Sequence, residues 1–326
     1  MSKVNPHADF IIHQNDLWNI TRVLHEYIPS VINNLKERRK IFQETGSTIV
    51  GIPSGFSTLD NLIGGFQPGI HLLAAEPGQG KTSFAVQLSC HATSQGYPVL
   101  FISLEESLER VTLRGMSLVT GTESKQLMDG TSDLEKIGLD SENNFDSLKK
   151  LYVIEANSRL TARKIADCAY KILNLHQADK CLVVIDYIQR LVSVSQGKSP
   201  KERQHTEFRH MLNHLINDIR EYSLELHCPF LLICSQNRPG QGGSRLTSLK
   251  ESGDLEYSGD TVSFLVEAEG ATVPAGARAI NFHIEKNRFG PSKVVVPMIF
   301  RPNLGKFAEL DDFQKYALKN KSKKSK

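Results

Sequence analysis

The stretch AEPGQGKT, residues 75–82, has the glycines, lysine and threonine of a loop that binds the phosphates of a nucleotide. An apolar run, HLLAA, comes before the loop and a helical pattern, SFAVQLSCHATSQG, follows it. In that order, backbone N–H groups and a helix N-terminus converge on phosphate oxygens. We therefore predict an ATP site. The expected contacts come from Glu76, Pro77, Gly78, Gln79, Gly80, Lys81, Thr82 and Ser83.

Two residues of this loop have individual roles, and a third departs from the usual pattern. Lys81 would reach the β- and γ-phosphates, and the Thr82 hydroxyl would bind Mg²⁺. The usual pattern has a glycine where this chain has Ala75. As the last residue of a strand, Ala75 would point away from the phosphates, and its methyl group is tolerable if its φ is negative. The alternative is a Gly/Pro turn with a chance Gly-Lys-Thr, which the flanking strand and helix disfavour.

Hydrolysis of a nucleotide also requires a second carboxylate at the Mg²⁺ and a base that orients the attacking water. Asp186 ends the apolar run CLVVID, where a Mg²⁺-binding aspartate belongs. Glu105 and Glu106 follow the run PVLFISL, and one of them, with Glu105 favoured, can reach the water. The alternatives are a cap or turn for Asp186 and a solvated first helical turn for the glutamates, where the dipole favours acids.

Three further polar residues follow core strands later in the chain. Gln236 comes directly after the run PFLLICS, where its amide could sense the γ-phosphate. Lys286 and Arg288 lie on a strand that leads into a Gly-Pro turn. One interpretation is that these alternating cations at a strand edge are only solvated. The other is that they neutralise phosphate charge in a neighbouring subunit's site, as arginine fingers do. The spacing leaves both interpretations open.

Short apolar runs separated by helical patterns must position these residues. The early runs are apolar throughout, which predicts a mostly parallel sheet with helices on both faces, in a doubly wound α/β domain. The later runs lie closer together and predict an antiparallel C-terminal extension. The predicted strands are 71–75, 98–104, 151–156, 181–186, 229–235, 261–268, 279–285 and 294–300. Polar loops at 193–207 and 237–248 each follow a core strand, where such folds usually place their sites.

The chain before residue 50 carries a separate helical pattern. Apolar residues recur at helical spacing from Asp16 to about Glu44, with a break or kink expected at Pro29 and an end before Gly46. The apolar stripe is narrow, so this helix needs a partner, either the chain's own core or a neighbouring subunit. We expect a helical or linker segment at 1–50, an ATPase domain at 51–310 and a basic, disordered tail at 311–326.

Composition narrows the class of protein only in part. A net charge of +3 selects no partner, since both nucleic-acid-binding proteins and metabolic enzymes carry such a balance. The five cysteines lack C-x-x-C spacing, which favours buried thiols over metal binding or disulfides. The N-terminus has no signal-sequence pattern, and no apolar run approaches the roughly 18 residues of a membrane span. We therefore expect a cytoplasmic protein without a membrane partner.

The order of these motifs resembles the RecA-fold motor domain of DnaB-type replicative DNA helicases, over roughly residues 25–308. The matching stretches are GIPSGFSTLDNLIGGFQPG, AEPGQGKTSFA, PVLFISLEES, LVVIDYIQRL, ICSQNR, KESGDLEYSGD and EKNRFGP. The family's phosphate loop commonly begins with alanine, as at Ala75. The resemblance implies a water-activating Glu105, a Walker B Asp186 and a γ-phosphate-sensing Gln236. It also implies that Lys286 and Arg288 act across a subunit boundary, as a piston lysine and an arginine finger.

The same resemblance implies a hexameric ring that passes single-stranded DNA through its centre and moves 5′ to 3′, with a helicase loader or primase as partner. DNA contact is expected in the two polar loops, from Lys198, Lys201, Arg203, Arg238 and Arg245. Each of these charges could instead be merely solvated. The family's N-terminal primase-binding domain is expected to be absent. What remains is a segment near 25–45 that resembles its linker helix, which in these helicases packs on the adjacent subunit.

Some positions depart from the family's pattern. The sensor loop after Ser235 and Gln236 is one residue shorter, and Lys250, Tyr257 and Gly259 replace the expected Arg, Gln and Ala. The leading hypothesis is an ATP-driven, ring-forming translocase or helicase on single-stranded DNA. A second is a RecA-fold regulatory or assembly ATPase, similar to KaiC circadian-clock proteins or RadA-type recombination proteins. A third is an accessory partner that joins a helicase ring through the linker helix without unwinding activity of its own.

Overall fold

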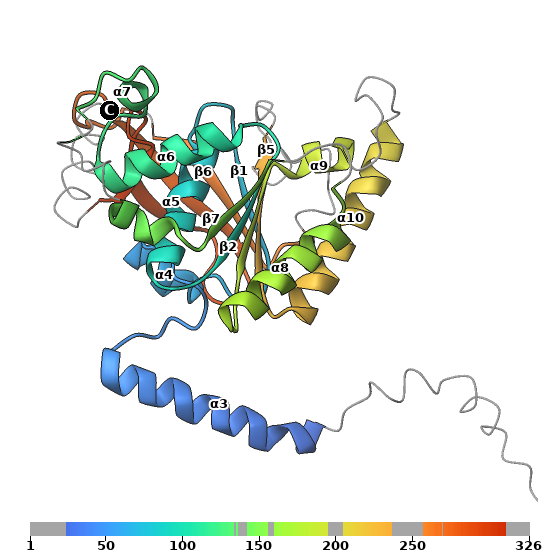
Figure 1. The fold of residues 1–326 in the computed structure, drawn as a ribbon. Coiled ribbons are helices and arrows are strands. Elements are labelled where there is room, and N and C mark those ends of the chain that lie inside the picture. Colours follow the sequence, from blue (N-terminus) through green and yellow to red (C-terminus); the bar gives the residue numbers. More distant parts are fainter. Residues whose placement is uncertain are drawn as a thin grey trace, which may run out of the picture. The chain divides into compact units, whose positions relative to one another are not determined.

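The structure is a computed structural model that describes residues 24–133, 135, 142–155, 160–194, 205–236, 257–268 and 270–310. The chain divides into two units, Met1–Thr48 and Ile49–Lys326, which we describe separately (Figure 1).

The described part of the first unit is one helix, α3 (Leu24–Thr45), in which no residue is buried. The helix continues through Pro29, so of the break or kink expected there the break is wrong. It ends before Gly46, as predicted: Gly46 has a φ of +68° and its N–H bonds the carbonyl oxygen of Phe42. The expected start of the helix, at residues 16–23, lies outside the described residues. Several large apolar side chains of the helix are exposed, namely Leu24, Tyr27, Ile28, Val31, Ile32, Leu35, Ile41 and Phe42.

The second unit is built on one sheet with the strand order β3-β2-β4-β5-β1-β6-β7-β8-β9. The strands up to β6 pair in parallel, and β6 to β9 pair antiparallel. The predicted α/β sheet with an antiparallel C-terminal extension is therefore confirmed. The strands are β1 (Gly69–Ala75), β2 (Val99–Ser103), β3 (Leu151–Glu155), β4 (Leu182–Asp186), β5 (Pro229–Ser235), β6 (Thr261–Glu267), β7 (Arg278–Asn287), β8 (Val294–Arg301) and β9 (Lys306–Glu309).

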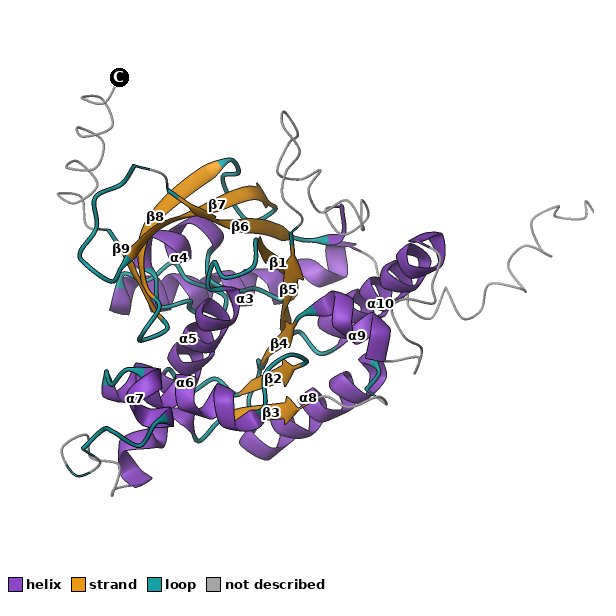
Figure 2. Ribbon diagram, turned by 90° about the horizontal axis from the view of Figure 1, so that it is seen from above, coloured by secondary structure: helices purple, strands orange, loops and turns teal. Residues whose placement is uncertain are grey.

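Helices cover both faces of this sheet, as predicted (Figure 2). Successive strand residues point to opposite faces: Leu72 of β1 packs in the core with α8, α9 and α10, and Leu73 packs in the core with α4, α5 and α6. The helices are α4 (Ser57–Ile63), α5 (Lys81–Ser94), α6 (Leu108–Thr120), α7 (Ser124–Met128), α8 (Ala162–His176), α9 (Ile188–Val194) and α10 (His205–Glu225), with a 3-10 helix at Glu142–Leu148. None of the helices in the described ranges is long and apolar enough to cross a bilayer.

The strand register aligns the chain segments that carry chemistry. Ala75 at the end of β1 is level with Ser235 at the end of β5, and Ser103 at the end of β2 is level with Asp186 at the end of β4. The polar residues that follow these strands therefore gather at one edge of the sheet. Because β7 runs antiparallel to β6, it begins at this same edge and ends at the opposite one.

The short strand β9 was not predicted. It has four residues, KFAE, and pairs with β8 so that Phe307 lies opposite Phe300. The two rings stack with their centroids 4.3 Å apart. A run this short carries little periodicity, so its assignment depends on its pairing partner rather than on its own residues.

Candidate nucleotide-binding site

The phosphate loop joins the end of β1 to the start of α5, at the edge where the parallel strands end. Two of its glycines have backbone angles that other residues rarely adopt, with φ of +78° at Gly78 and +88° at Gly80. A Cβ atom on Gly80 would lie 2.8 Å from the Phe307 ring and 2.9 Å from the Phe300 ring. Two features therefore require glycine at position 80: its positive φ, and the close approach of β8 and β9 behind the loop.

Ala75 is fully buried, its φ is not positive, and it packs in the core on the α4–α6 face. The expectation that a methyl group is tolerable here is confirmed. The carbonyl oxygen of Ala75 accepts a hydrogen bond from Lys81 Nζ at 2.8 Å, and that of Glu76 accepts another at 3.1 Å. Burial lowers the pKa of Lys81, while Asp186 and Glu105 act to raise it. The lysine is thus held against the backbone of the loop itself.

Thr82 and Asp186 form the oxygen-lined part of the site. The Thr82 hydroxyl donates to Asp186 Oδ2 at 2.7 Å, and Asp186 is 3% exposed. The pKa of Asp186 is raised to about 6, chiefly by burial; the Thr82 hydrogen bond opposes the rise, the charges of Glu105 and Glu106 add to it, and Lys81 opposes it. A hydroxyl and a carboxylate are the hard oxygen ligands that Mg²⁺ prefers, together with phosphate oxygens and water. These two residues fit the Mg²⁺ site that the sequence predicts.

The described residues contain no group of three or more His, Cys, Asp and Glu side chains that could hold a metal ion. A cation bound to Thr82 and Asp186 would therefore complete its shell with nucleotide and water oxygens, which is the usual arrangement for Mg²⁺ at phosphates.

Glu105 and Glu106 have different surroundings. Glu105 is exposed and lines an open cavity of about 420 Å³ beside the phosphate loop. Glu106 accepts two hydrogen bonds from the guanidinium of Arg114, at 2.6 and 2.7 Å, and Arg114 Nη1 donates to the Ser83 hydroxyl at 3.1 Å. The cavity is lined by Pro77, Gly78, Gly80, Lys81, Thr82, Ser83, Glu105, Arg114, Tyr187, Ser235, Phe300 and Pro302.

Arg114 is a cavity residue that the sequence analysis missed. It lies in the middle of α6, eight residues after Glu106, and belongs to none of the motifs. Gln189 of α9 was missed as well. Its side chain exchanges two hydrogen bonds of 3.3 Å with the backbone of Ser235, at the end of β5. No spacing rule for helices connects Arg114 to Ser83 or Gln189 to Ser235, because each contact crosses between elements.

Gln236 follows β5, the strand beside β1, as the sequence predicts. It is buried, and its backbone N–H donates to the carbonyl oxygen of Ala75 at 3.2 Å. The residue before it, Ser235, lines the cavity. The backbone N–H of Gln236 is therefore hydrogen-bonded to the last residue of β1, where the phosphate loop begins.

Lys286 and Arg288 are not brought to this cavity. Lys286 Nζ donates to the carbonyl oxygen of Tyr257 at 2.9 Å, and Arg288 Nη1 donates to Asp260 Oδ1 at 2.9 Å. Asp260 Oδ2 accepts from the N–H of Ile70 at 2.8 Å, near the start of β1. Because a strand rises about 3.3 Å per residue, this position is about 16 Å along β1 from the phosphate loop. The two cations lie at the opposite edge of the sheet from their own chain's cavity.

Other predicted residues lie outside the described part of the chain. These are the candidates for DNA contact, Lys198, Lys201, Arg203, Arg238 and Arg245, and one of the departures from the family pattern, Lys250.

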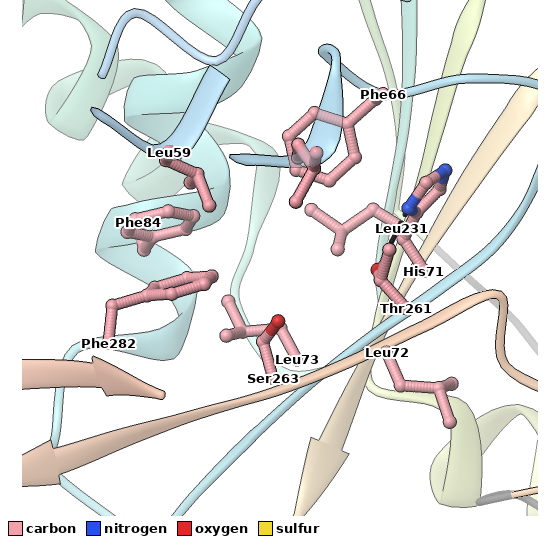
Figure 3. Close-up of a pocket in the computed structure, with 11 residues that line it drawn as sticks. Leu59, Phe66, His71, Leu72, Leu73, Phe84, Leu231, Thr261, Ser263 and Phe282 are labelled. Atoms are coloured by element: carbon pink, nitrogen blue, oxygen red, sulfur yellow. Dashed lines mark hydrogen bonds between the residues drawn. The ribbon is translucent and has the colours of Figure 1, made fainter. Parts of the chain in front are cut away.

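A second, small cavity lies in the core between α4, α5 and the strands β1, β6 and β7 (Figure 3). Its volume is about 10 Å³, which at most matches a single water. The imidazole of His71 sits at its side, bonded through Nδ1 to the Thr261 hydroxyl at 2.9 Å and through Nε2 to the carbonyl oxygen of Gln67 at 2.7 Å. This cavity is too small for a ligand.

Comparison with known proteins identifies the family. The family described as "DnaB-like helicase C terminal domain" matches residues 51–309 of this chain. The chain belongs to this family. The family that the motif order predicts is thereby confirmed, and a DnaB-like ATPase domain implies nucleotide binding.

The DnaB-like domain is 29% identical to "Replicative DNA helicase DnaB" of Helicobacter pylori (strain J99) over 258 residues, which are 75% of this chain and 49% of that protein. It is 27% identical to the protein of the same name from Leifsonia xyli subsp. xyli over 313 residues, 91% of this chain and 65% of that protein. The chain thus spans roughly half to two thirds of the length of these relatives.

Two solved structures show the same fold. One is described as an ATPase domain, with a TM-score of 0.71, 19% identity, and coverage of 86% of this chain and 99% of that one. The other is described as "The Structure Of A DnaB-Like Replicative Helicase And Its Interactions With Primase", with a TM-score of 0.69, 18% identity, and coverage of 93% and 76%. The predicted RecA-like α/β core of the DnaB-like domain is confirmed.

Proposed function

We propose that this chain is a subunit of an ATP-hydrolysing ring that translocates 5′ to 3′ on single-stranded DNA and unwinds duplex DNA in replication. The observation that carries the proposal is a separation between two sets of residues. Lys81, Thr82, Glu105 and Asp186 lie at the cavity edge of the sheet, and Arg288 lies at the opposite edge. From there Arg288 cannot reach a nucleotide held by its own loop, so a complete site requires a second copy of the chain.

Each residue at the cavity has a task in this proposal. Thr82 and Asp186 would hold Mg²⁺, which would neutralise charge on the β- and γ-phosphates. Lys81 leaves the loop carbonyls and binds the same phosphates. Glu105 takes a proton from the attacking water. The oxygen of this water bonds to the γ-phosphorus as the bond from that phosphorus to the β–γ bridging oxygen breaks and ADP leaves. Gln236 senses the γ-phosphate from the neighbouring strand and passes its state to the loop that follows.

The exposed apolar side of α3 supports assembly into a ring. Large side chains such as Tyr27, Val31 and Leu35 are about half exposed, although such residues favour burial. A neighbouring copy is the partner that we propose for this side of the helix, and a hexamer is the ring that we propose. We also propose that residues 1–50 are a linker segment and that residues 51–310 are the ATPase domain.

The partners of the motor are single-stranded DNA, with a helicase loader or a primase as a further protein partner. One of the structures with this fold is described with primase interactions, which supports that choice. We propose the DNA contacts at Lys198, Lys201, Arg203, Arg238 and Arg245, where cations would neutralise the phosphate backbone. We also propose a cytoplasmic location for this motor.

The test is ATP hydrolysis with and without single-stranded DNA, together with the solution mass with and without ATP. We expect DNA to stimulate hydrolysis several-fold, the mass to correspond to a ring, and Lys81→Ala to abolish hydrolysis. The measurement is made at low salt, since DNA affinity falls steeply with ionic strength. If DNA does not stimulate hydrolysis and the protein does not bind DNA under these conditions, the proposal is overturned. Nucleotide-dependent assembly without any effect of DNA would support a regulatory ATPase or an accessory helicase partner instead.

A further inference from the structure

Arg278, the first residue of β7, holds the tip of the phosphate loop of its own chain. Its Nη1 donates to the carbonyl oxygen of Gly78 at 2.8 Å, and its Nη2 donates to the side-chain oxygen of Gln79 at 2.7 Å. Both acceptors belong to the loop. Arg278 is therefore in contact with a segment that lies 200 residues earlier in the chain.

Glu267, the last residue of β6, orients this arginine. It accepts hydrogen bonds from Arg278 Nε at 3.1 Å and from Nη2 at 2.7 Å, in the two-pronged geometry that carboxylates and guanidinium groups favour. The Gln79 side-chain nitrogen donates to the same carboxylate at 3.4 Å. The bonds from Arg278 to Glu267 also lower the pKa of Glu267. Arg278 thus reaches the loop from a fixed position at the sheet edge.

Open space lies beside Gly78, in the part of the loop that Arg278 contacts. A Cβ atom on Gly78 would meet nothing within 4 Å, whereas one on Gly80 would collide with the rings behind the loop. Glycine also has the largest conformational freedom to lose when it is ordered. The hydrogen bonds from Arg278 to Gly78 and Gln79 therefore restrain the loop tip where nothing packs beside Gly78.

We infer that Arg278, oriented by Glu267, is a positioning residue that keeps the tip of the phosphate loop in the shape that binds nucleotide. The inference rests on the proposed function of that loop. Arg278 acts through the loop rather than on the phosphates, because its guanidinium already donates to Glu267, Gly78 and Gln79.

The first test measures the affinity for ADP that carries a fluorescent N-methylanthraniloyl label on the ribose. Arg278→Met should raise the Kd for labelled ADP about fivefold, the scale of losing two hydrogen bonds from a charged donor at a partly exposed site. At saturating ATP, kcat should change by less than about twofold, because Arg278 does not touch the reacting atoms. Arg278→Lys, which keeps the charge but not the fork, should give an intermediate Kd.

The role of Glu267 is tested by a double-mutant cycle. Glu267→Gln should raise the Kd on its own by less than Arg278→Met does. In the Arg278→Met background it should add nothing, since it acts through the arginine. The matched control is Arg163→Met, which removes another exposed arginine–carboxylate pair, with Asp167 on α8. It should leave the Kd unchanged.

A second test follows hydrogen exchange in peptides that cover residues 74–84 of the nucleotide-free protein. Arg278→Met should speed exchange there, and Arg163→Met should not. If the wild-type protein binds labelled ADP, and Arg278→Met changes neither the Kd nor the exchange, the inference is wrong and the proposed function stands. If the wild-type protein binds no labelled ADP, the proposed function is overturned and the inference with it, whatever the exchange rates.

Discussion

At the scale of single residues, the exposed carboxylate of Glu105 faces the cavity, whereas that of Glu106 is paired with Arg114. A general base must contact the water whose proton it takes. A carboxylate in a bidentate ion pair with a guanidinium is poorly placed to do so. We predict that Glu105→Gln lowers kcat for ATP hydrolysis by at least about a hundredfold and leaves nucleotide affinity nearly unchanged. Steady-state hydrolysis and labelled-ADP binding measure the two quantities.

Glu106→Gln is the matched control, since it makes the same chemical change one residue further along. Its kcat should stay within about tenfold of the wild-type value, because only the orientation of Arg114 is weakened. A larger loss for Glu106→Gln than for Glu105→Gln would reverse the assignment of the base.

The buried imidazole of His71 makes stability depend on pH. Burial lowers its pKa to about 4, from an ordinary value near 6.5. Between these values the unfolded chain binds a proton that the folded chain does not, so stability is lost as the pH falls from 6.5 towards 4. We predict that this residue alone removes about 2 kcal/mol of unfolding free energy between pH 7 and pH 5.

Urea unfolding of the wild-type protein and of His71→Gln, at pH 7 and at pH 5, isolates this contribution. The substitution lowers stability at both pH values. The loss of unfolding free energy from pH 7 to pH 5, however, should be about 2 kcal/mol smaller in His71→Gln than in the wild-type protein. An equal pH dependence in both proteins would show that His71 does not titrate as its burial implies.

At the scale of elements, the phosphate loop depends on strands that form at the other end of the chain. Gly80→Ala places a methyl group against the stacked rings of Phe300 and Phe307, whereas Gly78→Ala meets open space. Both changes strain a positive φ, at a cost of roughly 1–2 kcal/mol. We predict that Gly80→Ala costs a further 1–3 kcal/mol, roughly, from overpacking. Thermal unfolding of the two variants measures the difference, and equal losses would contradict the contact with β8 and β9.

Asp260 joins three elements at the opposite edge of the sheet. This buried carboxylate accepts hydrogen bonds from the N–H of Ile70 on β1, from Arg220 on α10 and from Arg288 after β7. Removing it leaves three donors without their acceptor, so Asp260→Ala should lower the unfolding free energy by about 3 kcal/mol. Asp167→Ala, from an exposed pair, should cost less than about 1 kcal/mol. Similar urea midpoints for the two variants would argue against this role.

At the scale of the whole molecule, the proposed ring predicts that a site shared between copies can be rebuilt from two defective chains. Lys81→Ala removes the phosphate lysine but keeps Arg288, and Arg288→Ala keeps the intact loop. We predict that each variant alone is nearly inactive, and that an equal mixture recovers about a quarter of the sites through random assortment in the ring. ATP hydrolysis after co-assembly measures the recovery.

The control for this mixture is a chain with both substitutions, Lys81→Ala and Arg288→Ala, mixed with either single variant. Neither mixture can form a complete site, so neither should gain activity. If the first mixture gains no more than these controls while the chains co-assemble, Arg288 does not act across a subunit boundary.

The sequence by itself determined the features that depend on neighbouring residues. Runs of apolar residues predicted the strands from β1 to β8 to within a few residues. The signal is strongest in β1, β2, β4 and β5, because strands buried on both faces have few polar positions. The order strand, glycine-rich loop, helix predicted the phosphate loop around Lys81. The position of Asp186 and Gln236 at the ends of core strands predicted that both lie near this loop. In each case the signal is local, within one element and its ends.

Only the tertiary structure decided which side chains from distant segments meet. It brought Arg278 to Gly78, Arg114 to Ser83, and Asp260 to Arg288. It also showed that α3 continues through Pro29 and that KFAE pairs as β9. The physical reason is that strand order and register set these contacts, and each residue's own neighbours in the chain carry no trace of a partner that lies many residues away.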